Sequence, residues 1–363
     1  MIECIFTLDY EIFGNGEGSL HEQVYKPAQE LKGVFEEVAA KLVVFVEVAE
    51  LQKIENSGAD SAIDDVKHQL RELYQNGHEI ALHLHPQWYN AKLQNGKWDL
   101  DYTEYNLCTL KPERIGFIVQ KAIGYLGRII GSPAFIPLSF RAGNWLLQPT
   151  ATIAGILAQY GIKVDSSVFK GGVQHLHRLD YRLACGNGWH WRFSNDVNVP
   201  DIQGSLLELP IYTEMVPFWC MITGKRFGLQ QKTRAAKSGG DAKGGPPWRV
   251  GRLRDYLRLQ YPLKFDFCRM TLRELTAMVE RVMRLDAMTP SVLKPLVAIG
   301  HTKDLMDLGT IEVFLNWLRQ RDIPISTFAS LYSRRLLESC PPIYAPQLHA
   351  TPANCSHTSI TRW

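Results

Sequence analysis

The chain of 363 residues lacks the features that mark membrane, secreted and nucleic-acid-binding proteins. No stretch approaches about eighteen consecutive apolar residues, so we expect no membrane-spanning helix. The net charge is only +3, which is too small to indicate a nucleic-acid or membrane partner. Residues 1–10 lack the basic start and long apolar run of a signal peptide. These absences predict a globular, cytoplasmic protein.

Two common cofactor motifs are also missing. The seven cysteines are scattered, and no two form a CxxC pair, so we expect reduced cysteines rather than a disulfide framework. The glycine-rich stretch at 13–19 lacks GxGxxG spacing and has no helical pattern directly after it. The sequence therefore does not predict a phosphate-binding loop there.

Short apolar runs alternate with helical patterns along most of the chain. The runs at 42–46 and 295–300 are continuously apolar, which is typical of strands covered on both faces. Alternation with short loops indicates parallel βαβ units, and hence one large α/β, barrel-like domain over 1–338. Strands are predicted at 2–6, 42–46, 80–85, 135–140, 162–164, 206–211, 295–300 and 323–328. Helices are predicted at 27–41, 62–76, 112–130, 150–160, 271–284, 309–320 and 331–338.

A basic, glycine-rich segment interrupts this pattern. Residues 225–258 hold ten Lys and Arg against two Asp, and KSGGDAKGGPP in their middle is flexible by composition. We therefore predict a flexible insertion at about 222–262, either a solvated surface loop or an arm for an anionic glycan or phosphate-bearing carrier. The proline-rich residues 339–363 are predicted to be a poorly ordered tail.

Polar side chains follow the predicted strands. His83 and His85 leave one face of a strand, about 6–7 Å apart, and Pro86 ends the ladder there. Two such imidazoles can close on one metal ion, although two ordinary half-buried histidines would give the same pattern. Asp9 and Glu11 likewise share a face, directly after an apolar strand where an unpartnered carboxylate would be costly.

Three further polar residues lie at predicted strand ends, namely Arg141, Asp165 and His301. In parallel α/β folds the functional site lies at the carboxyl ends of the strands. The sequence therefore predicts that these residues meet the histidine pair and the carboxylates at one end of a barrel.

In the order of five motifs the sequence resembles the polysaccharide deacetylase family (carbohydrate esterase family 4, the NodB-homology domain). The motifs are TLDYE at 7–11, HLHPQW at 83–88, FRAGNW at 140–145, VDSSVF at 164–169 and AIGH at 298–301. The resemblance implies a distorted (β/α)7-type barrel that removes an N-acetyl group from a sugar with the help of a metal ion.

The resemblance also assigns roles to individual residues. Asp9 matches the catalytic base, and Arg141 matches the arginine that pairs with this base and keeps it ionised. His301 matches the general acid. Asp165 matches the aspartate that orients and tunes that histidine.

The metal motif departs from the family pattern. The family has a second aspartate after the first and two histidines four residues apart, but this chain has Tyr10 and Gln87 at those positions. Glu11 and His85, each two residues away from its partner, are the available substitutes. A set of Glu11, His83 and His85 suits zinc with one open position, while Gln87 could ligate through its carbonyl oxygen instead.

Aromatic residues accompany these motifs, and sugar sites often present aromatic faces to a ring. Tyr10, Trp88 and Trp145 are the predicted substrate-binding aromatics, with core packing as the alternative for each. The sequence thus predicts a zinc-dependent deacetylase of an N-acetylated saccharide, such as a glycan precursor. The alternatives are the same machinery acting on a non-sugar amide, or an inactive barrel that binds saccharide.

Overall fold

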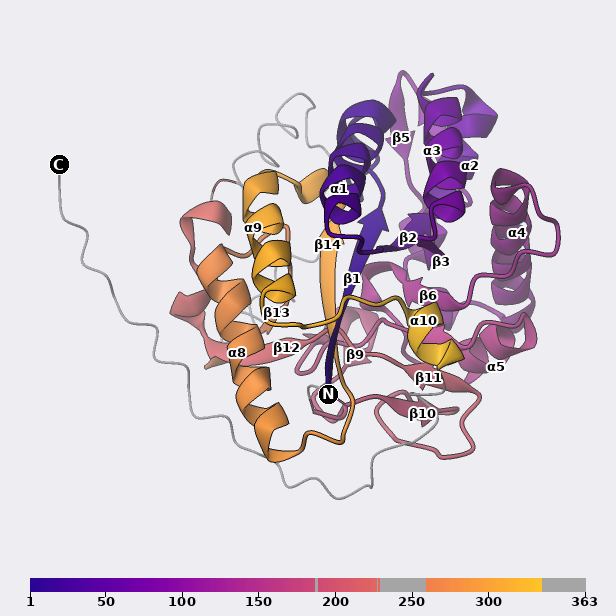
Figure 1. Cartoon of the computed structure of the whole chain (residues 1–363). Coiled ribbons are helices and arrows are strands. Elements are labelled where there is room, and N and C mark those ends of the chain that lie inside the picture. Colours follow the sequence, from indigo (N-terminus) through magenta and orange to yellow (C-terminus); the bar gives the residue numbers. More distant parts are fainter. Residues whose placement is uncertain (187–188, 227, 229–258, 335–363) are drawn as a thin grey trace.

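A computed structural model describes residues 1–186, 189–226, 228 and 259–334. Its centre is a curled eight-stranded sheet in the order β10-β11-β7-β6-β3-β2-β1-β14, with helices packed around it (Figure 1). All pairs in this sheet are parallel except the edge pair of β10 with β11. The strands are β1 Ile2–Tyr10, β2 Val43–Glu47, β3 Glu79–Leu84, β6 Ser139–Ala142, β7 Val164–Asp165, β10 Trp191–Phe193, β11 Leu206–Glu208 and β14 Lys294–His301.

The chain that follows β11 closes the curled sheet toward β14. Ile211 forms a parallel bridge with Val297, and the backbone N–H of Tyr212 donates to the Val297 carbonyl at 3.0 Å. Asp266 forms a second bridge, with Ile299. These single bridges replace continuous ladders, so the barrel is closed but distorted.

Side chains alternate between two buried faces of the sheet. In β1, Phe6 and Leu8 belong to the large core under the outer helices, whereas Ile5 belongs to a smaller core inside the barrel. Asp9 lies an even number of residues from Ile5, so it shares the inner face.

The helices cover the outer face of the sheet (Figure 1). Gly58 and Gly131, both with positive φ, end α2 and α4. The sequence reading missed α2, which begins directly after β2 without any intervening turn residues. The helices are α1 Lys26–Glu37, α2 Val48–Ser57, α3 Ile63–Gln75, α4 Pro112–Ile130, α5 Ala151–Gln159, α8 Leu272–Met288, α9 Leu308–Arg319 and α10 Phe328–Ser333.

Two predicted elements are corrected. The predicted strand at 323–328 is wrong, because only Ile325 bridges Cys4 and a short helix, α10, begins at Phe328. Phe328 and Leu331 of α10 fill the inner core. The strand predicted at 135–140 begins only at Ser139, since the preceding residues form a turn after α4.

Three two-stranded antiparallel sheets flank the barrel in the described part of the chain, and the sequence pattern did not predict them. One of them, β12 with β13, spans the basic segment and reaches the site described below. Their strands are β4 Lys92–Gln94, β5 Lys97–Asp99, β8 Val173–Gln174, β9 Leu179–Asp180, β12 Thr213–Pro217 and β13 Gln260–Lys264.

Most of the predicted insertion, and the tail at 339–363, lie outside the described residues, so both remain predictions along with the domain limit at 338. Cys4, Cys108 and Cys268 are free and buried, but the expectation of seven reduced cysteines is wrong at Cys220, which is disulfide-bonded. Among the described residues, no helix has the length and apolarity to cross a membrane.

Candidate metal and catalytic site

The strand register brings the predicted residues together at the carboxyl ends of the strands. Asp9 in β1 is paired directly with His301 in β14. His83 in β3 is paired with Glu47 on one side and with Arg141 on the other. Cross-strand partners lie about 5 Å apart, so side chains on the inner face converge.

Glu11 lies at the centre of a histidine–carboxylate cluster. Its Oε2 is 3.1 Å from Nε2 of His85 and 3.5 Å from Nε2 of His83. Ligands around a tetrahedral zinc lie roughly 3.3–3.5 Å from one another, given bonds of about 2.0–2.1 Å. With Glu47, the donor atoms of these buried residues all lie within 4.8 Å of one another. The cluster can therefore hold a divalent ion without large rearrangement.

The second ring nitrogen of His83 is fixed by the backbone. Its Nδ1 lies 2.9 Å from the Arg141 carbonyl, which accepts a hydrogen bond and leaves Nε2 facing Glu11. Burial lowers the pKa of His83, but the Asp9 and Glu11 carboxylates outweigh burial and raise it to about 9. Binding of a metal to Nε2 must therefore release a proton.

The second ring nitrogen of His85 faces two amides. Gln87 Nε2 lies 3.2 Å and Asn144 Nδ2 3.3 Å from His85 Nδ1. Gln87 Oε1 is buried without a hydrogen-bond partner. If the Gln87 amide turns, Oε1 accepts from Nδ1–H, which leaves Nε2 of His85 unprotonated and able to bind a metal.

Replacing Gln87 with Leu is therefore expected to weaken zinc binding about 10–100-fold, because His85 loses the acceptor that fixes its tautomer. Gln87→Glu keeps an oxygen acceptor and should retain most of the affinity. Competition with a chelating dye measures this, with Gln75→Leu on an exposed helical face as the control. Equal affinities for wild type and Gln87→Leu would contradict this role.

Asp9 forms a fully buried ion pair with Arg141. The Arg141 Nη1 donates to Asp9 Oδ1 at 2.5 Å, and its other nitrogens donate to Thr7 Oγ1 and to the Ser166 carbonyl at 2.9 Å. Burial raises the pKa of Asp9, but the Arg141 guanidinium and the nearby histidines outweigh it and lower this pKa below its usual value. Asp9 is thus held ionised.

His301 lies between two carboxylates. Its Nε2 is 3.4 Å from Asp9 Oδ2, and its Nδ1 is 3.5 Å from Asp304 Oδ2. Burial lowers the pKa of His301, against the opposing effect of the two carboxylates. The imidazole is positioned to exchange protons next to Asp9.

Asp165 does not have the position predicted for it. Its Oδ1 and Oδ2 accept from the hydroxyl and the backbone N–H of Ser167, both at 2.9 Å. Burial raises the pKa of Asp165 and also that of the neighbouring Glu208. The carboxylate beside Nδ1 of His301 is instead Asp304, so the expected pairing of Asp165 with His301 is corrected.

Two charged residues of the site were missed in the sequence. Glu47 accepts from the His85 backbone N–H at 2.6 Å and caps α2 through Ala49 and Glu50. Glu47 directly follows the apolar strand at 43–46, which is the signal that singled out Asp9. Lys303 Nζ contacts Glu11 Oε1 at 2.6 Å, and no local pattern could have indicated it.

Of the three predicted aromatics, only Trp145 reaches the site. Its ring centre is 6.4 Å from that of His301, and both Asn144 and Trp145 have positive φ, at 54° and 60°. Two consecutive non-glycine residues in this strained conformation are typical of functional loops. Tyr10 and Trp88 are buried in the outer core, where Tyr10 Oη donates to Gln69 Oε1 at 2.6 Å, so both expectations are corrected.

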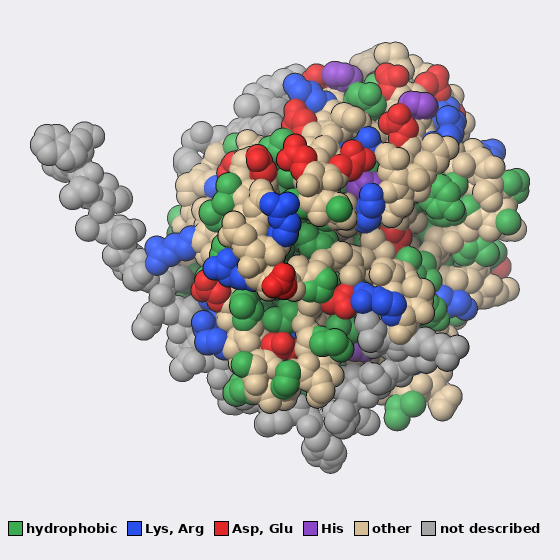
Figure 2. Space-filling model, in the orientation of Figure 1, with side chains coloured by type: hydrophobic (Ala, Val, Ile, Leu, Met, Phe, Trp, Pro, Cys, Tyr) green, Lys and Arg blue, Asp and Glu red, His purple; other side chains and the backbone are tan. Residues whose placement is uncertain are grey.

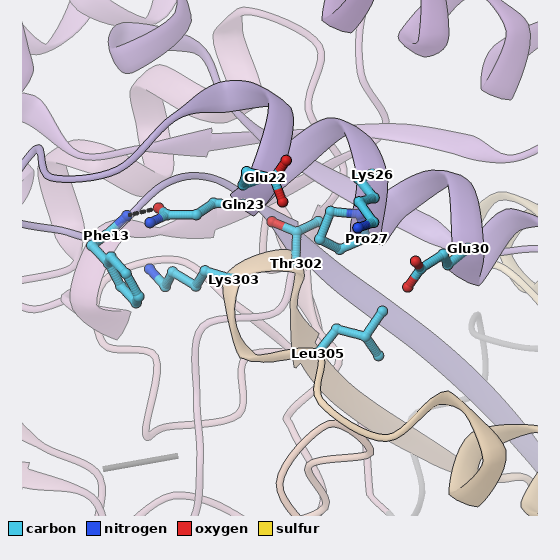
Figure 3. Close-up of a pocket in the computed structure, with 9 residues that line it drawn as sticks. All are labelled: Phe13, Glu22, Gln23, Lys26, Pro27, Glu30, Thr302, Lys303 and Leu305. Atoms are coloured by element: carbon cyan, nitrogen blue, oxygen red, sulfur yellow. Dashed lines mark hydrogen bonds between the residues drawn. The ribbon is translucent and has the colours of Figure 1, made fainter. Parts of the chain in front are cut away.

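A cavity of about 340 Å³ is lined by nine described residues, and none of them belongs to the histidine–carboxylate cluster (Figure 3). Lys303 lines this cavity, and its Nζ donates to Glu11 Oε1. On the face seen in Figure 2, acidic and basic side chains are interspersed, unlike the broad basic surface of a nucleic-acid-binding protein. The residues lining the cavity are Phe13, Glu22, Gln23, Lys26, Pro27, Glu30, Thr302, Lys303 and Leu305.

The sequence matches no family model and no curated protein. Its structure is similar to a candidate polysaccharide deacetylase from Mycobacterium smegmatis, with 15% identity, a TM-score of 0.50, and coverage of 96% of this chain and 95% of that one. It is also similar to GH57 branching enzymes from Thermococcus kodakaraensis and Pyrococcus horikoshii. These are 12% and 10% identical, with TM-scores of 0.52 and 0.50, and the matches cover 91% and 92% of this chain and 70% of each enzyme.

At these identities the likeness concerns the fold. The chain has a curled α/β barrel like that of the candidate deacetylase, so the predicted fold class is confirmed. Because this fold also occurs in branching enzymes, only the side chains of the site can point to a reaction.

Proposed function

We propose that this protein is a metal-dependent hydrolase that removes the N-acetyl group from an amino sugar or glycan precursor. The observation that carries the proposal is the position of Glu11 Oε2 between Nε2 of His83 and Nε2 of His85. This histidine–carboxylate cluster lies beside the Asp9–Arg141 pair and His301, which are the groups that amide hydrolysis requires.

Glu11, His83 and His85 would hold the metal, with zinc as the ion that this donor set suits best. Glu47 stands behind His85, with both carboxylate oxygens already accepting backbone hydrogen bonds. When bound, a divalent ion supplies Lewis acidity and lowers the pKa of water.

Asp9 and His301 would move the protons. Asp9 is held ionised by Arg141, so it can take a proton from the attacking water. His301 in its protonated form gives a proton to the departing nitrogen. Asp304, 3.5 Å from its Nδ1, stabilises this imidazolium against the burial that lowers the pKa of His301. The 3.4 Å between His301 Nε2 and Asp9 Oδ2 keeps the base and the acid side by side.

Metal analysis of the purified protein tests the proposal, with wild type beside His83→Ala and His85→Ala. We expect one divalent ion per chain in the wild type and its loss in both variants, because each removes one of three ligands. His68→Ala, on an exposed helical face, is the matched control and should retain the metal.

Thermal unfolding with added zinc gives a second readout that does not depend on turnover. The wild type and His68→Ala should gain stability from zinc, and the two ligand variants should not. Acetate release from acetylated amino sugars then tests the reaction itself. A wild-type protein that holds no metal after zinc soaking would contradict the proposal and favour the saccharide-binding alternative.

A further inference from the structure

Lys264 is a cation at the edge of the site whose ammonium makes no hydrogen bond or ion pair with any residue that the structure describes. Its contacts are with aromatic faces: Nζ lies 3.2 Å from the ring centre of Trp145 and 4.5 Å from that of Phe169. Within the described part of the chain no carboxylate pairs with this half-buried ammonium, so it is open to an anionic partner.

The backbone around Lys264 is held firmly next to the catalytic strand. Lys264 is the last residue of β13 and pairs with Thr213 of β12. The following residue, Phe265, donates to the Tyr212 carbonyl at 2.8 Å and accepts from the backbone N–H of Ile299 in β14 at 2.9 Å. The position of the ammonium is therefore tied to the strand that carries His301.

Trp145 connects the ammonium with the reacting groups. The Lys264 ammonium packs on one face of the Trp145 indole. The indole and the His301 ring form a T-shaped pair with ring centres 6.4 Å apart. Because Lys264 covers that face, Trp145 orients the cation rather than offering this face to a sugar ring.

The acidic residues nearby have other partners. Asp9 is paired with Arg141, and Asp304 is paired with Arg269 at 2.5 Å. Asp266 Oδ1 accepts the backbone N–H groups of Cys268 and Arg269, both at 3.1 Å. Burial and the Arg269 charge lower the pKa of Lys264 to about 7, and a bound anion would counter both effects.

We propose that Lys264 binds an anionic group, a carboxylate or a phosphate, on the N-acetylated substrate. The inference deepens the proposed function and rests on it: the substrate of the site is an acidic saccharide rather than a neutral one. A neutral sugar leaves the ammonium unpaired, whereas an acidic sugar gains a charge-assisted hydrogen bond that also fixes its register beside His301.

The test compares three probes that share the acetamido sugar: N-acetylglucosamine, N-acetylmuramic acid with a carboxylate, and N-acetylglucosamine 1-phosphate. Calorimetric affinities and KM values for acetate release are measured for wild type, Lys264→Gln and Lys264→Arg. Lys163→Gln, at an exposed position, is the control. Lys264→Gln should bind the acidic probe about 10–100-fold more weakly and the neutral probe unchanged, while Lys264→Arg retains the preference.

The two acidic probes distinguish the two anions. If Lys264→Gln loses affinity only for N-acetylmuramic acid, the bound group is a carboxylate, and if it loses affinity only for the phosphate probe, the group is a phosphate. If wild type and Lys264→Gln prefer the acidic over the neutral probes to the same extent, the inference is overturned. This holds even if the variant melts at a lower temperature, because the comparison is between probes on one protein. If the protein releases acetate but Lys264→Gln keeps the wild-type preference for acidic probes, this inference is overturned and the proposed reaction stands. Lys264-dependent binding of an acidic probe without any acetate release instead supports the inference and overturns the proposed reaction.

Discussion

Replacing Asp9 with Asn is expected to lower kcat by about 10²–10⁴-fold while the protein keeps its metal. The amide cannot accept the proton of water, but its shape and its contact with Arg141 are largely preserved. Asp9 is not among the three proposed metal ligands, and its Oδ1 is already occupied by the guanidinium at 2.5 Å. Activity and metal content should therefore separate in this variant.

The measurement is acetate release alongside metal content on the same preparations, with His83→Ala as the contrasting variant that loses both. Asp99→Asn in the exposed hairpin controls for the chemical change itself. An Asp9→Asn protein with wild-type kcat would show that another group acts as the base, whereas loss of metal in this variant would make Asp9 a ligand.

The sequence predicted which residues meet at one end of the sheet wherever a strand places a single polar residue on the inner face. Asp9, His83, Arg141 and His301 all follow apolar runs, and parallel strands end at one edge of the sheet, so their meeting follows from strand order alone. The prediction failed where strand alternation was not applied. Tyr10 lies between Asp9 and Glu11 in the chain, so its side chain must point to the opposite, helix-covered face.

Other parts of the site depend on contacts that no local pattern encodes. Lys303 contacts Glu11, although nearly the whole chain separates them in sequence. Lys264 lies in the β12–β13 sheet, which flanks the barrel. The aspartate motif suggested Asp165 as the partner of His301. A carboxylate three residues after His301, Asp304, takes that place because the short helix after β14 turns it back toward the imidazole.

Replacing Arg141 with Met is expected to destabilise the protein by about 3–5 kcal/mol, the usual cost of leaving one member of a buried ion pair without its partner. Arg141 is fully buried and stacks on Phe45, with Cζ 4.1 Å from the ring centre. Its loss leaves Asp9, Thr7 Oγ1 and the Ser166 carbonyl without their donors. Urea denaturation of the chelator-treated protein measures this change.

The double variant Asp9→Asn/Arg141→Met separates charge from packing. Because it removes the carboxylate together with the guanidinium, it should recover a large part of the lost stability, giving a coupling free energy of the kind that close, buried partners show. Additive effects of the two substitutions would mean that Arg141 acts through packing alone.

The pH dependence distinguishes the same two cases. In the wild type the pKa of Asp9 is lowered, so the pair stabilises the fold above the usual carboxyl pKa of about 3.9 and this contribution is lost as the pH falls through the folded-state value. Without Arg141, burial raises the pKa of Asp9, and protonation then relieves the unpaired charge. The penalty of Arg141→Met should therefore shrink as the pH is lowered from 7 toward the carboxyl range, whereas a penalty from packing alone would stay constant.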